Sequence, residues 1–254
     1  MTEKRPKLSR TSAMHVAKLV FRSSLFLAVL AVYLPAKLRG AEGFYEIFAG
    51  VPWLLPFIWI AFMADMFKRM LIPGDIESMG SQKLFRKNYR PSGEHPEHVT
   101  VLSPARTAVT AGSWFLLNGI IFLLYFRGIL DEGAMLLISL FYSMSDMICI
   151  LFFCPFQTWM MENRCCTTCR IYNWDFPMMF TPMAVSGHFF QRSLFLVSMI
   201  VLIQWEVQLH LHPEYFSEQT NESLRCVNCT EKLCRHKKQL HSFWRRLRKA
   251  GKQI

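Results

Sequence analysis

Apolar residues occur along this chain in long runs, which basic and polar segments separate. A helix needs about 20 mostly apolar residues to cross the ~30 Å hydrocarbon core of a bilayer, and several runs approach that length. The pattern predicts an all-α, polytopic integral membrane protein with about five to six transmembrane helices. The predicted full spans are residues 19–35, 47–67, 108–126, 134–154 and 193–211.

One further apolar segment, residues 176–191, is shorter than an ordinary span. It has about 16 residues, where about 20 are usual. It also contains Pro177, Pro182 and Gly187, which interrupt regular helix. Such a segment fits a broken or re-entrant helix, provided that protein or water covers its unpaired backbone groups. We therefore expect one broken helix in addition to the full spans.

Basic charge divides the chain into a basic N-terminus, a transmembrane domain with two polar loops, and a basic tail that contains cysteines. Their bounds are 1–18, 19–211 with loops at 68–107 and 155–175, and 212–254. Basic loops stay on the cytoplasmic side of a membrane, so we expect the N-terminus and both loops to be cytoplasmic. Arg22, in the first span, is then expected to extend its guanidinium to the inner interface.

The side of the tail depends on the number of crossings. If segment 176–191 crosses, or dips in and returns, the tail is cytoplasmic, and we favour this arrangement. If the chain crosses only five times, the tail lies outside. In that case the triplets that begin at Asn221 and Asn228 would be glycosylation sequons in a eukaryotic lumen.

The end of the tail, residues 240–254, has the pattern of a basic amphipathic helix. Its apolar residues follow the i, i+3, i+4, i+7 spacing of one helix face and are Leu240, Phe243, Trp244 and Leu247. Such helices lie on anionic membrane surfaces, and anionic lipid is richest in the cytoplasmic leaflet. The pattern therefore favours an inside tail. We expect anionic lipids to bind Trp244, Arg245, Arg246, Arg248 and Lys249.

Composition and charge agree with this class of protein. Apolar residues make up 52% of the chain, and its mean hydropathy is +0.20. The net charge of +11 would suggest nucleic acid for a soluble protein. Here the retention of basic loops in the cytoplasm accounts for it, and no nucleic-acid recognition motif accompanies the charge. We expect the lipid bilayer as the partner and no nucleic acid; the sequence identifies no protein partner.

Six of the eight cysteines form two clusters in polar segments. The clusters are Cys165, Cys166 and Cys169 in the loop, and Cys226, Cys229 and Cys234 in the tail. Each contains a C-x2-C turn, in which two thiolates can converge on one tetrahedral metal, and two such turns supply four sulfurs. The spacing predicts a metal site, zinc favoured, that joins the loop to the tail if both lie on the same side.

Other interpretations of these cysteines stay open. Iron or an iron–sulfur cluster also takes four thiolates and would make the protein a membrane redox component. Disulfides or reactive thiols are expected if the tail lies outside in an oxidising compartment. The remaining two, Cys149 and Cys154, lie in or at the end of a span and are interpreted as small buried apolar residues.

Three polar residues within apolar segments are further candidates. Ionisable groups inside a bilayer are costly and often functional. Asp65 lies near the end of the second span, and Asp146 lies deep in the fourth. For Asp146, a hydrogen bond inside the bundle and a transport or proton role stay equally open. His188 lies near several methionines, as in a haem or copper site, but packing is the preferred role of those methionines.

The sequence assigns no reaction. It contains no P-loop, no glycine-rich nucleotide fingerprint, no nucleophile elbow and no HExxH motif. The GEHPEH stretch at 93–98 is interpreted as a solvated turn. Three classes stay open: a non-catalytic membrane protein held together by a cysteine metal site, a redox component with iron at the same cysteines, and a small transporter that uses Asp146.

Overall fold

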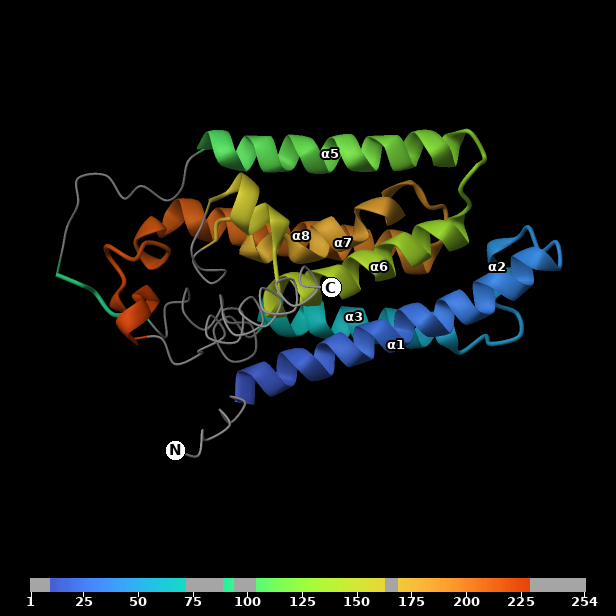
Figure 1. Ribbon diagram of the computed structural model, residues 1–254, viewed down its shortest axis with the longest axis horizontal. Coiled ribbons are helices and arrows are strands. Elements are labelled where there is room, and N and C mark those ends of the chain that lie inside the picture. Colours follow the sequence, from blue (N-terminus) through green and yellow to red (C-terminus); the bar gives the residue numbers. More distant parts are fainter. Residues whose placement is uncertain (1–9, 72–88, 94–103, 163–168, 229–254) are drawn as a thin grey trace, which may run out of the picture.

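The computed structural model describes residues 10–71, 89–93, 104–162 and 169–228, and these form an all-α bundle (Figure 1). Its long helices are α1 (Arg10–Leu38), α3 (Leu54–Leu71), α5 (Pro104–Phe126), α6 (Glu132–Leu151) and α8 (Phe189–Leu211). The shorter elements are α2 (Phe44–Ile47), η2 (Phe156–Met160), η4 (Tyr172–Trp174), α7 (Asp175–Phe180), η5 (Thr181–Val185), η6 (Pro213–Tyr215), η7 (Glu222–Leu224) and η8 (Cys226–Asn228).

Four of the described helices are long and apolar enough to cross a membrane, which confirms the predicted membrane class. They are residues 13–38 of α1 and the whole of α5, α6 and α8. The second span, predicted at 47–67, forms α3 only from Leu54 onward, and Asp65, Lys68 and Arg69 all lie in the second half of α3. Among the described residues α3 does not meet the same measure of length and hydropathy. Five to six crossings therefore remain a prediction.

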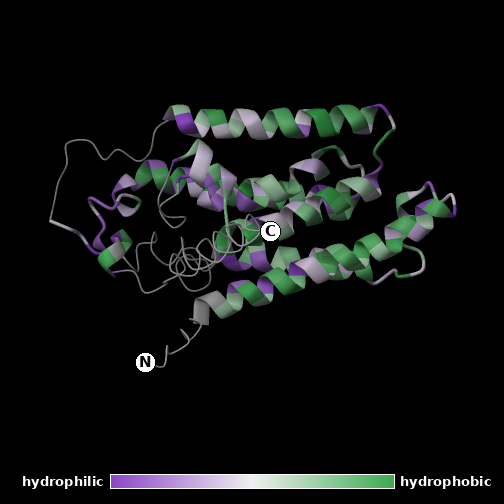
Figure 2. Ribbon diagram, viewed as in Figure 1, coloured by the Kyte–Doolittle hydropathy of each residue, from purple (hydrophilic) through white to green (hydrophobic). Residues whose placement is uncertain are grey.

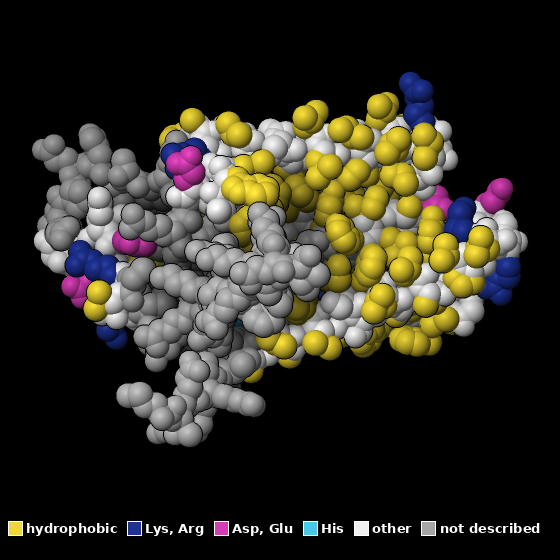
Figure 3. Space-filling view, in the orientation of Figure 1, with side chains coloured by type: hydrophobic (Ala, Val, Ile, Leu, Met, Phe, Trp, Pro, Cys, Tyr) yellow, Lys and Arg dark blue, Asp and Glu magenta, His cyan; other side chains and the backbone are white. Residues whose placement is uncertain are grey.

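The outer surface of these helices suits contact with lipid tails. Along α5 large apolar side chains point outward, including Phe115, Leu116 and Phe126, which are each about 70% exposed. Figure 2 shows α5 as mainly hydrophobic, and in Figure 3 hydrophobic side chains cover the middle of the face in view while charged ones lie toward its ends. A soluble monomer rarely exposes so large an apolar area. The protein is thus a multi-pass membrane protein in contact with the bilayer.

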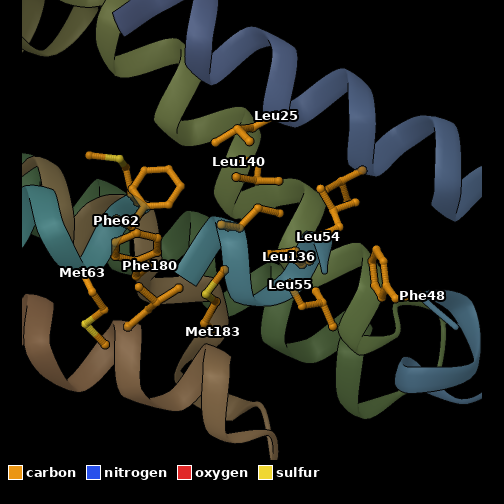
Figure 4. Close-up of a cluster of buried hydrophobic side chains, with 14 of the residues drawn as sticks. Leu25, Phe48, Leu54, Leu55, Phe62, Met63, Leu136, Leu140, Phe180 and Met183 are labelled. Carbon is orange, nitrogen blue, oxygen red and sulfur yellow. The ribbon is translucent and has the colours of Figure 1, made fainter. Parts of the chain in front are cut away.

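The main core lies between α1, α3, α6, α7, η5 and α8. Leu25, Leu140 and Phe62 meet there with Phe180 and Met183, all at most 4% exposed (Figure 4). The α1–α6 contact requires a glycine at one point. A Cβ at Gly133 would lie 2.7 Å from Cε2 of Tyr33, so no larger residue fits without a shift of the ring.

The segment predicted as a broken helix forms no single helix. It consists of α7 and η5, with Pro182 at the beginning of η5, and then an extended stretch from Ser186 to His188 before α8. Asp175 at its start pairs with Arg69 near the end of α3, whereas the Gly187 amide at its end donates to Glu132 at the start of α6. The segment therefore runs along the bundle from one end to the other, covered by α6 and α8 (Figure 1).

Residues 89–93, the described part of the first polar loop, are bound to the tail. Pro91 and Asn221 form an antiparallel bridge. The Ser92 amide donates to the Thr220 carbonyl at 3.1 Å, and the Glu222 amide donates to the Arg90 carbonyl at 2.8 Å. Loop and tail thus lie together at one end of the bundle. The predicted amphipathic helix at 240–254, with Trp244, Arg245, Arg246, Arg248 and Lys249, lies outside the described residues.

Candidate functional site

A buried network of charged side chains lies near the end of the bundle where α1 begins and α3 and α6 end. Arg22 of α1 is at its centre and is only 3% exposed. Its Nη1 donates to Oδ2 of Asp146 at 2.9 Å and to the Ser143 carbonyl at 3.1 Å, and its Nη2 lies 3.5 Å from Oδ2 of Asp65. The predicted extension of Arg22 to the interface is wrong, because its guanidinium instead neutralises carboxylates of α3 and α6 inside the bundle.

Two further ion pairs complete this network. Lys18 lies one helical turn before Arg22, and its Nζ is 3.0 Å from Oδ1 of Asp65. Arg69 of α3 pairs with Asp175 of α7 at 2.6 Å and stacks on Phe176 at 4.4 Å. Three cations therefore face three carboxylates. Such a balance is what burial requires, because an unpaired buried charge costs several kcal/mol.

His15 adds a histidine beside this network. It is 2% exposed, and neither ring nitrogen has a hydrogen-bond partner in the described part of the chain. Lys18, Arg22, Arg69 and Asp65 all act on it electrostatically. The sequence did not indicate that His15, three residues before Lys18 on α1, is buried beside these charges, because by its place in the apolar pattern it lies at a membrane interface.

A cavity of about 130 Å³ lies beside two of the carboxylates of this network. Asp146 and Asp175 line it, and each of them is bonded to an arginine that does not line it. Apolar and sulfur-containing side chains form most of the remaining wall. These are Trp114 of α5, Tyr142, Cys149 and Ile150 of α6, Cys154, Phe156, Cys169, Ile171, Tyr172, Met178 and Met179.

Two of the three cysteines that line this cavity are not among those with the strongest sequence signal. Cys149 and Cys154, interpreted from the sequence as packing residues, line it together with Cys169. The pattern could not indicate this, because they come from α6, from the turn after it and from the loop beyond. The other predicted metal ligands, Cys165, Cys166, Cys229 and Cys234, lie outside the described residues, as does the Cys226 side chain.

The described residues contain no group of three or more His, Cys, Asp or Glu side chains arranged to hold a metal ion. Contacts among the described residues hold the end of the loop that contains the first cysteine cluster next to the tail. Arg170 donates two hydrogen bonds to Glu206 of α8, one of them at 2.7 Å. Trp174 donates to the same carboxylate at 2.9 Å and packs against the cluster that contains Phe216 and Leu224.

His188 occupies the opposite end of the bundle from Asp65 and Asp146. Its ring stacks on Phe44, with centroids 4.5 Å apart, and its Nε2 contacts the Glu132 carboxylate. Glu132 and Asp146 are separated by about 21 Å along α6, at 1.5 Å per residue. The three polar residues that the sequence singled out therefore form two sites rather than one.

A smaller polar cluster lies at that same opposite end. Asp131 accepts hydrogen bonds from the Ala134 amide at 2.8 Å and from the Tyr33 hydroxyl at 3.2 Å, and it pairs with Lys37 at 3.0 Å. Burial disfavours its charged form, but the Ala134 amide and Lys37 outweigh this and lower the pKa of Asp131 below its ordinary value. The cluster ties α1 to the start of α6.

Comparison of this chain with protein-family models, with curated proteins and with solved structures found no match in any of the three.

Proposed function

We propose that the protein is a small membrane transporter and that its substrate site is the cavity at Asp146. The observation that carries this proposal is that the Asp146 carboxylate belongs both to the cavity wall and to the buried charge network. It lines the cavity, and it is also bonded to Arg22 in a network that joins α1, α3, α6 and α7. A ligand that reaches this carboxylate competes with Arg22. Binding can therefore change the contacts between helices, as transport requires.

The interrupted segment provides the element that moves. Asp175 begins α7, lines the cavity and is bonded to Arg69, so α7 responds to the cavity and to α3 together. Short helices that meet at Pro182 and end in an extended stretch can reorient at their junctions more readily than one continuous helix. The wall of the cavity thus contains both a charged contact and a jointed segment.

The cavity cysteines report directly on this function. Purified protein in liposomes is treated with a small charged methanethiosulfonate reagent from the outside or from the inside, and mass spectrometry measures modification of Cys149. A transporter opens its site to each side in turn, so Cys149 is modified from both sides. A Ser198→Cys variant is the control, because Ser198 is fully buried in α8 away from the cavity. If Cys149 is modified from only one side, or from neither, the transport proposal fails.

A second candidate function has its own observation. A cysteine metal site between loop and tail requires both to lie at one end of the bundle. The contacts of Arg170 and Trp174 with Glu206, and of residues 89–93 with the tail, support that requirement. We propose zinc as the metal and Cys165, Cys166, Cys169, Cys226, Cys229 and Cys234 as the pool of ligands.

Metal analysis tests this second function. One zinc per chain is expected, lost when Cys166 and Cys229 are replaced by serine. No metal in protein purified without oxygen would end the proposal. Visible absorption separates zinc from the redox alternative, since zinc is colourless while iron–thiolate centres absorb.

We also propose that both termini are cytoplasmic and that α7 with η5 is the fifth of six crossings, broken rather than continuous. The support is that this segment runs from the end of the bundle where α3 finishes to the opposite end, where α6 begins. The next helix, α8, therefore returns to the end at which α1 begins. The tail would then meet the anionic leaflet. Labelling of tail cysteines from the cytoplasmic side alone is expected, and labelling from the outside alone would contradict this orientation.

A further inference from the structure

We infer that the cavity at Asp146 binds a small organic ammonium ion, an inference that rests on the proposed function by naming the substrate class of the same site. Three properties of the cavity lead to it: the sign of the charges on its wall, the aromatic rings around it, and its volume.

Among the described residues, the charged side chains that line the cavity are both carboxylates. Asp146 and Asp175 line the cavity, and no lysine, arginine or histidine lines it among the residues that the structure describes. Their partners, Arg22 and Arg69, approach from α1 and α3 outside the cavity. Asp146 and Asp175 carry like charges that repel one another, while Arg22 and Arg69 attract Asp146. A cation between them relieves that repulsion, whereas an anion adds to it.

Aromatic rings form much of the remaining wall. Trp114 and Tyr142 lie with ring centroids 4.7 Å apart, and Trp114 and Phe156 lie 6.0 Å apart. Tyr172 adds a fourth ring. Aromatic faces attract cations through the ring quadrupole, and aromatic cages bind substituted ammonium groups in this way. The described residues contain no group of three or more His, Cys, Asp or Glu side chains arranged to hold a metal ion, while alkyl groups on nitrogen match the apolar walls.

The volume limits the size of the ligand. A dry apolar cavity of about 150 Å³ holds one benzene molecule. The present cavity is about 130 Å³ and is partly open, so it holds a compact ammonium group. Choline is a suitable probe. Its uncharged isostere, 3,3-dimethylbutan-1-ol, has carbon in place of the nitrogen and therefore isolates the contribution of charge.

Titration calorimetry of the full-length protein in detergent micelles compares the two probes. Choline is expected to bind about tenfold or more tightly than the alcohol, from cation–π attraction together with two carboxylates. Equal or weaker binding of choline would overturn the inference. This comparison needs no substitution, so it does not depend on whether a variant folds.

Two variants locate the site. Tyr142→Leu keeps an apolar wall but removes a ring, and we expect about a fivefold loss of choline affinity with little change for the alcohol. Phe141→Leu is the matched control, because Phe141 is its neighbour on α6 and does not line the cavity. Asp146→Asn is expected to lower choline affinity about tenfold. Equal losses in the Tyr142 and Phe141 variants would contradict the assignment of the site.

The outcomes separate this inference from transport itself. If choline binds selectively while Cys149 is modified from neither side, the site is a cation site of a protein that does not transport, and only the proposed function fails. If Cys149 is modified from both sides while choline and the alcohol bind alike, transport stands and the ammonium inference fails.

Discussion

Replacement of Arg22 by methionine tests whether the buried network holds the bundle together. Methionine keeps most of the length and apolar volume of the side chain but removes the guanidinium. Asp146 then loses its bonded cation, while Asp65 keeps Lys18 at 3.0 Å. The main consequence is therefore one carboxylate left unpaired on α6.

The structure sets the size of the expected effect. The side chains of Arg22 and Asp146 are 4% and 19% exposed, so solvent screens their interaction little. Removing one member of a buried ion pair costs about 3–5 kcal/mol. Lys18→Met is the matched control within the same network. Lys18 and Asp65 are 26% and 24% exposed, and Asp65 still has Arg22 nearby, so that variant should cost less than Arg22→Met.

The assay is unfolding in mixed detergent micelles by titration with dodecyl sulfate, with helicity as the signal and the free energy of unfolding as the result. A double variant, Arg22→Met with Asp146→Leu, removes both charges and should recover most of the loss. It should still lack about 1 kcal/mol, because the Ser143 carbonyl loses a donor in both variants. The reasoning is refuted if Arg22→Met costs no more than Lys18→Met, or if the double variant is as unstable as the single one.

Three further predictions concern other contacts. Gly133→Ala should lower the free energy of unfolding by about 1–3 kcal/mol, because its Cβ would meet the Tyr33 ring, whereas Gly119→Ala, in open space, should cost less. The lowered pKa of Asp131 means that its stabilisation is present above pH ~4 and is lost as pH falls through the folded value; Asp131→Asn should therefore flatten the acid side of a stability–pH curve. Asn221→Ala should speed proteolysis at residues 89–93, since the buried Asn221 side chain holds that loop to the tail; an unchanged cleavage rate would contradict this.

The sequence alone was enough to recognise the membrane class and the break before α8. Run length and charge are local properties, and a bilayer imposes the same requirement on each run separately. Pro182 and Gly187 signal an interruption whatever packs around them. For the same reason Asp146 could be identified as unusual from its position in an apolar run, without any knowledge of its partner.

The partners themselves depended on tertiary structure. Arg22 could reach the interface or a neighbouring helix, and the choice follows from the packing of α1 against α6 and α3, which brings two carboxylates within reach. The cavity combines α5, α6, η2 and α7, so no single stretch of sequence contains its pattern. Cys149 looked like a packing residue for this reason. Periodicity indicates which face of a helix is buried, but only the arrangement of helices in space decides what that face meets.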